Sequence, residues 1–134
     1  MEKIFKCNKL AIDAYQALAM RTNDELSVSR VYNACTESFT DTSKPDPGEL
    51  LNGALGLTGE AGEVSDMIKK HIFHGHDLDR DELIKELGDV CWYVALLCTA
   101  IDVDLSDVMT RNINKLKMRY PEGFSESASI NRKE

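Results

Sequence analysis

The stretch that decides the fold runs from residue 57 to residue 93 and reads LTGEAGEVSDMIKKHIFHGHDLDRDELIKELGDVCWY. It holds two acidic pairs of equal spacing, Glu60 with Glu63 and Glu86 with Asp89. Side chains three residues apart on an α-helix share a face, so each pair directs two carboxylates into one volume. Glu60 and Glu86 both fall among apolar residues when the stretch is wound as helices. Because an unpaired carboxylate on a buried face is costly unless it is protonated or binds a cation, the four carboxylates predict a cation site.

The connection between the two pairs predicts that they meet. Gly75 is expected to end the first helix, and Asp79 with Glu82 is typical of a capping box that opens the second. Such a short connection makes the helices antiparallel neighbours, and the two pairs should come level to within about one turn. Carboxylate oxygens suit Mg²⁺, with Mn²⁺ as a substitute, better than zinc.

The rest of the chain is also helical in pattern. The expected elements are a helix over residues 9–21 with Asn8 as its N-cap, helices over 47–73 and 80–100, and a fourth from 105 to just before Pro121. Residues 22–46 are expected to add a short helix or an ordered loop. We therefore predict an all-α fold, with one helical domain over residues 1–124, a variable insert at 22–46, and a disordered tail over 125–134.

The composition limits the possible partners. The chain of 134 residues has 16 basic and 23 acidic residues, a net charge of −7. This acidic balance argues against a general nucleic-acid-binding protein, which needs a basic surface. The sequence shows no signal-peptide pattern and no apolar run of membrane-spanning length, so we expect a cytoplasmic protein that does not bind membranes.

Two groups of polar side chains are candidates for substrate contacts. Tyr15 and Gln16 on the first helix could contact a base or sugar, although a packed aromatic and a surface amide are the simpler interpretation. Asn112, Lys115 and Arg119 share one face of the last helix. On an otherwise acidic molecule, such a ridge is the natural partner for phosphates near a metal.

The helix over 80–100 is apolar nearly all round, which indicates that it is covered on more than one side. Trp92 and Leu96 point away from the first acidic pair, so we expect them to meet another subunit.

Histidines offer a weaker alternative. His71, His74 and His76 straddle the expected helix end, where a transition-metal site is disfavoured and the helix dipole explains a histidine in the last turn. An HD-type phosphohydrolase built on His76 and Asp77 would need further histidines elsewhere in the chain.

Three segments of the chain carry a resemblance to a known family: GLTGEAGEV, FHGHDLDRDELIKELGDVCWY and RNINKLKMRYPEGF. With them the chain resembles the MazG family of nucleotide pyrophosphohydrolases, within the all-α NTP pyrophosphatase superfamily. Its metal signature is E-x-x-E, a spacer, and E-x-x-D. The resemblance implies a four-helix-bundle fold, assembly as a homodimer or a dimer of dimers, and Mg²⁺ held by Glu60, Glu63, Glu86 and Asp89.

The implied activity is hydrolysis of a nucleoside triphosphate to monophosphate and pyrophosphate, in the housecleaning of nucleotide pools. Glu60 or Glu63 would serve as the catalytic base, Tyr93 matches a substrate-contacting position, and Asn112 and Lys115 match positions near the phosphates. The alternative is a catalytically weak bundle that binds a nucleotide or regulates a partner. The sequence leaves open which base is preferred and which phosphorus is attacked.

Overall fold

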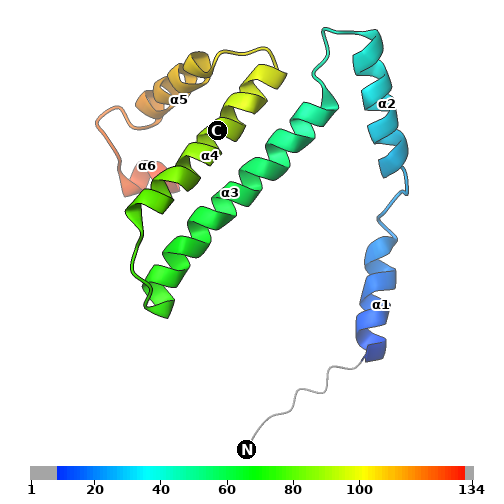
Figure 1. The fold of residues 1–134 in the computed structure, drawn as a ribbon, viewed down its shortest axis with the longest axis horizontal. Coiled ribbons are helices and arrows are strands. Elements are labelled where there is room, and N and C mark those ends of the chain that lie inside the picture. The colour runs from blue at the N-terminus through cyan, green and yellow to red at the C-terminus, as the bar shows by residue number, and fades with distance from the viewer. Residues whose placement is uncertain (1–8, 132–134) are drawn as a thin grey trace, which may run out of the picture.

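The computed structural model describes residues 9–131, and these form helices joined by short connections (Figure 1). The helices are α1 (Lys9–Met20), α2 (Ser27–Thr40), α3 (Pro47–His74), α4 (Arg80–Ala100), α5 (Leu105–Arg119) and α6 (Glu126–Ile130). No strand occurs among the described residues. The predicted all-α class is confirmed.

The centre of the fold is an antiparallel hairpin of α3 and α4, which pack against each other along most of their length (Figure 1). Asp46 caps α3 by accepting a hydrogen bond from the Gly48 amide at 2.7 Å. Gly75 ends α3 in the left-handed region, with φ of 73°, which a glycine adopts without strain. Asp79 then caps α4 by accepting from the Asp81 and Glu82 amides, each at 3.0 Å. The signals that predicted the turn therefore form it.

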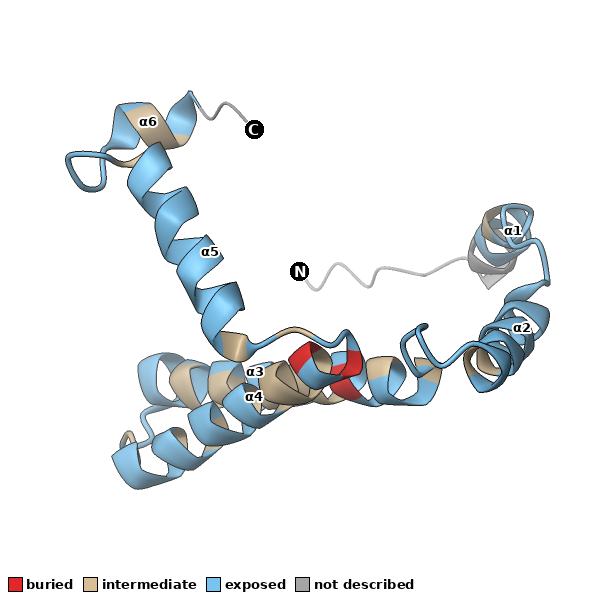
Figure 2. Ribbon diagram, turned by 90° about the horizontal axis from the view of Figure 1, so that it is seen from above, coloured by how far each residue is buried: buried red, intermediate tan, exposed pale blue. Residues whose placement is uncertain are grey.

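The outer helices do not close a four-helix bundle around this hairpin within one chain. Helix α2 contacts the start of α3, and α5 contacts α4 and then runs away from the hairpin (Figure 2). Helix α1 lies apart from α3 and α4 (Figure 1). The helices expected of a bundle are thus present, but in the described chain only α3 and α4 pair along their length.

The hairpin buries few side chains. Among the described residues, the buried ones are Gly53, Cys98 and Ala100, which cluster where the start of α3 meets the end of α4 (Figure 2). Large apolar side chains remain exposed on every helix from α1 to α6; Trp92 is 57% exposed and Met118 is 85% exposed. An apolar surface of this extent is typical of a protein–protein interface.

Two segments can be compared with their expectations in more detail. Residues 22–46 contain a helix, as one of the two alternatives expected, but α2 is longer than a short helix, with 14 residues. The expected disordered tail instead contains the short helix α6, which Ser125 caps by accepting from the Ala128 amide at 3.2 Å. Ser125 is a good N-cap residue, and this local signal outweighs the polar composition of the tail. Asn8, the expected cap of α1, lies outside the described residues.

Candidate metal centre

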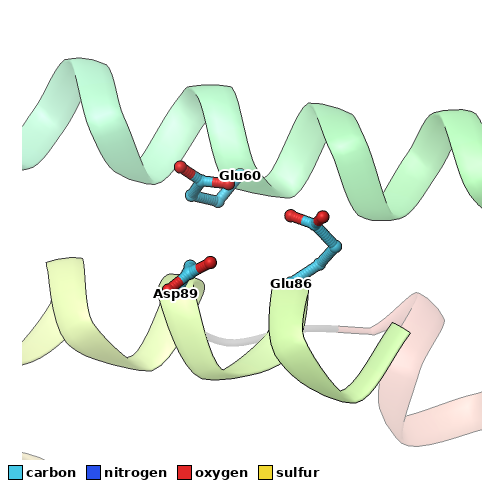
Figure 3. A group of neighbouring side chains, drawn as sticks. All are labelled: Glu60, Glu86 and Asp89. Carbon is cyan, nitrogen blue, oxygen red and sulfur yellow. The ribbon is translucent and has the colours of Figure 1, made fainter. Parts of the chain in front are cut away.

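Three of the four predicted carboxylates converge between α3 and α4. Glu60 on α3 and Glu86 and Asp89 on α4 each offer one oxygen atom, and these three atoms all lie within 4.8 Å of one another. Figure 3 shows the carboxylates directed into the space between the two helices. Glu60 and Glu86 are half-buried, and Asp89 is exposed. We call these residues the acidic cluster.

The cluster arises from the helical periods on both sides of the turn. Glu86 and Asp89 are one turn apart on α4, so both face α3. The antiparallel packing of the hairpin brings Glu60 level with them. Glu63, one turn nearer to the turn between the helices, is exposed and is not part of the cluster.

The electrostatics of Glu86 show how crowded the cluster is. Removal from water raises the pKa of Glu86 above its ordinary value, and the neighbouring carboxyl group of Glu60 adds to this rise. The negative charges of Glu60, Glu63 and Asp89 raise the pKa of Glu86 further. Glu63 therefore lies close enough to act on the cluster through its charge.

No basic side chain neutralises the cluster in the described part of the chain. The ion pairs found there lie elsewhere, and the nearest along α3 joins Asp66 to Lys69 and Lys70. Hydrogen bonds from these two lysines lower the pKa of Asp66 to about 2. The i,i+3 and i,i+4 spacing of these three residues predicts such ion pairs, in contrast to Glu60, which lies nearly two turns earlier on α3.

The donor set fits a hard divalent cation. All three groups supply carboxylate oxygen, and Mg²⁺ binds oxygen at about 2.0–2.1 Å, so two oxygens on one ion lie at most about 4.2 Å apart. The present separations of up to 4.8 Å come within this limit by small rotations of the side chains. None of the histidines belongs to a group of potential metal ligands among the described residues, and His71 Nδ1 instead lies 2.9 Å from the carbonyl oxygen of His76.

Tyr93 is the predicted substrate residue that lies nearest to the cluster along the chain, one turn beyond Asp89 on α4. It is half-buried, and its ring meets Trp92 edge to face, with centroids 4.9 Å apart. Its ring also lies against Gly56 of α3. The sequence gives no local signal for this contact, because it depends on how α3 and α4 pack.

The remaining predicted substrate residues do not reach the cluster of their own chain. Asn112 and Lys115 are exposed and Arg119 is half-buried, all on α5, which leads away from the hairpin (Figure 2). Tyr15 and Gln16 are exposed on α1, which lies apart (Figure 1). A single chain therefore presents the carboxylates and Tyr93 without these polar partners.

Two cavities lie at the other end of the hairpin, with volumes of about 490 and 460 Å³. The first is lined by the connection between α2 and α3 and by the end of α4, and the second by the connection between α4 and α5 and the start of α5. Neither includes a residue of the acidic cluster or any predicted substrate residue.

Comparisons with known proteins agree with the geometry. Residues 50–124 match the sequence profile of the MazG nucleotide pyrophosphohydrolase domain, and this range includes the whole α3–α4 hairpin except its first three residues. The chain is also 44% identical over 82 residues to the "Gene 37 protein" of Mycobacterium phage L5, which covers 58% of this chain and 72% of the phage protein. No solved structure matches the chain. No helix of the described residues is long and apolar enough to cross a membrane.

Proposed function

The chain belongs to the MazG nucleotide pyrophosphohydrolase family, and from this premise we propose that it hydrolyses a nucleoside triphosphate to a monophosphate and pyrophosphate. The observation that carries the proposal is the acidic cluster, three carboxylates from two antiparallel helices with oxygens within 4.8 Å of one another and no basic partner among the described ion pairs. Such a cluster is unfavourable without a cation, and a triphosphate brings further oxygens to the same ion.

In this proposal Glu60, Glu86 and Asp89 hold Mg²⁺, with Glu63 at the edge of the site. Bound Mg²⁺ would neutralise charge on the phosphate oxygens and lower the pKa of a coordinated water. Mn²⁺, which prefers the same oxygen ligands, is the expected substitute.

Glu63 is the better of the two candidates for the general base. Glu60 is committed to the cluster, whereas Glu63 is exposed beside it and is free to accept a proton. The oxygen of water would attack phosphorus, its proton would pass to the Glu63 carboxylate, and the bond between the bridging oxygen and the α-phosphorus or β-phosphorus would break, which releases pyrophosphate.

Assembly is part of the proposal. The exposed Trp92 and the long apolar faces of α4 and α5 fit an interface between copies of the chain. A homodimer or a dimer of dimers would let Lys115 and Arg119 of one copy approach the acidic cluster of another, because opposite charges attract and α5 leads away from its own cluster.

The experiment is an assay of pyrophosphate release across a panel of canonical, deoxy and damaged nucleoside triphosphates with Mg²⁺. Wild type is expected to turn over at least one of them, and Glu63→Gln is expected to abolish this turnover while it preserves the helical circular dichroism. Asp66→Asn is the matched control, because Asp66 lies on the same helix one turn further on and is paired with lysines. Turnover retained by Glu63→Gln would exclude the assigned role.

The same panel tests the alternative of a nucleotide-binding or regulatory bundle. Binding of nucleotide and Mg²⁺ without release of pyrophosphate from any member of the panel would favour that alternative.

A further inference from the structure

The α3–α4 hairpin is built in layers, one helical turn apart. Three pairs of facing residues, one from each helix, follow one another from the acidic cluster toward the start of α3: Glu60 with Asp89, Gly56 with Tyr93, and Gly53 with Leu97. Members of successive layers are three or four residues apart on each helix, a rise of roughly 5–6 Å. The Tyr93 ring is therefore the layer next to the acidic cluster.

Gly56 makes room for this ring. A Cβ atom placed on Gly56 would overlap Cε1 and Cζ of Tyr93 and would stand 2.6 Å from Cδ1. Real Cβ contacts are not that short, so any side chain at position 56 would displace the ring. The Tyr93 ring thus occupies space that only glycine leaves free.

Two further glycines of α3, Gly59 and Gly62, separate this role from a general weakening of the helix. A Cβ on Gly59 or Gly62 would meet no atom within 4 Å, although both lie in the same helix close to the acidic residues. A glycine inside a helix is less favourable than alanine by about 1 kcal/mol, so each needs a reason, and at position 56 the reason is the Tyr93 ring.

We propose that Gly56 is a positioning residue that sets the Tyr93 ring against the nucleoside part of the substrate. The inference rests on the proposed function, because it takes the phosphates to bind at the acidic cluster. A nucleotide held there by its phosphates has its sugar and base within reach of the neighbouring layer, and an aromatic ring binds a base or sugar face without regard to charge.

Substitution of Gly56 by alanine tests this positioning role through the affinity for substrate. Gly56→Ala is expected to raise KM for the best nucleotide of the panel about tenfold, the scale of a lost aromatic contact to a base, with kcat nearly unchanged. Gly62→Ala, whose added methyl group meets open space, is the matched control and is expected to keep the wild-type KM.

A double-mutant cycle separates the action through Tyr93 from a structural effect. Tyr93→Leu removes the ring that overlaps with the added methyl group, so Gly56→Ala should raise KM no further in that background. The double variant also relieves the overlap, so it reports on the proposal even if Gly56→Ala alone folds poorly.

Trp92 supplies a readout that needs no turnover. It is the single tryptophan of the chain and meets the Tyr93 ring edge to face. Gly56→Ala should shift its fluorescence emission, whereas Gly62→Ala should not, nor should Gly56→Ala in the Tyr93→Leu background.

The outcomes are distinct. An unchanged KM for Gly56→Ala, or effects of Gly56→Ala and Tyr93→Leu that simply add, would overturn the positioning role while the hydrolase proposal stands. If wild type releases no pyrophosphate from any nucleotide, the proposed function fails, and nucleotide affinity measured by quenching of Trp92 replaces KM in the same comparison.

Discussion

Glu60 on α3 and Glu86 on α4 face each other across the hairpin, with carboxylate oxygens within 4.8 Å of each other. The pKa of Glu86 lies above its ordinary value, first because the side chain is removed from water and then because Glu60 lies beside it. Either a proton or a cation can relieve the repulsion in such a cluster, and the choice between them can be measured.

Removal of one of these charges should stabilise the cation-free protein. In Glu86→Gln the amide replaces a carboxyl group that is desolvated and repelled by Glu60, Glu63 and Asp89. We expect a higher melting temperature than wild type in EDTA near neutral pH, together with loss of Mg²⁺-dependent pyrophosphate release. Glu82→Gln is the control and should not raise the melting temperature, because Glu82 lies one turn before Glu86, is exposed and pairs with Lys85.

The stability of the cation-free protein should fall as pH rises through the titration of Glu86. The unfolded chain loses this proton near pH 4.5, whereas the folded protein keeps it to a higher pH. Between these two values the folded state binds more protons, so the free energy of unfolding decreases with increasing pH. Thermal melts in EDTA from about pH 4 to about pH 8 measure this slope, which should be smaller in Glu86→Gln; equal slopes in the two proteins would contradict the assignment.

Mg²⁺ or Mn²⁺ should reverse the effect of pH on the stability of the folded protein. A cation that binds only the folded state at about 100 times its Kd adds about 2.7 kcal/mol to the free energy of unfolding. Because the ligands must be deprotonated, this stabilisation should grow as pH rises. Melts with and without Mg²⁺ check it, and Asp89→Asn should lose the stabilisation and lower kcat/KM by about 10²-fold or more. An equal Mg²⁺ effect in Asp89→Asn would place the cation elsewhere.

The elements of the hairpin could be predicted from the sequence because their signals are local. Gly75 and Asp79 each act on backbone groups within five residues, and they end α3 and begin α4 as expected. The cap that Asp46 forms on α3 is equally local. The sequence does not decide which glutamate of α3 meets Glu86 and Asp89. Counting residues from the turn aligns the two acidic pairs only to within one helical turn, and Glu60 and Glu63 are themselves one turn apart.

The placement of the outer helices could not be predicted, because an apolar stripe shows that a helix is covered without showing what covers it. The family resemblance led to the expectation of a four-helix bundle, yet Ile113 on α5 remains half exposed in the single chain. The partner of Gly56 was hidden for a related reason, since it depends on the register between α3 and α4, which only packing fixes.

Assembly should depend on Trp92. The side chain is 57% exposed on the apolar helix α4, and tryptophan is prominent among interface residues whose loss costs about 2 kcal/mol or more. Trp92→Glu adds a charge to that surface and should raise the dissociation constant of the assembly about 30-fold or more. Arg80→Glu is the control, because it adds acidic charge in the first turn of the same helix, about a third of the way around from Trp92. Light scattering across a range of protein concentrations measures the change, and an unaltered mass for Trp92→Glu at every concentration would remove Trp92 from the interface. If Lys115 and Arg119 of α5 act across that interface, Trp92→Glu should also lose pyrophosphate release. This activity should return at protein concentrations where the assembly re-forms.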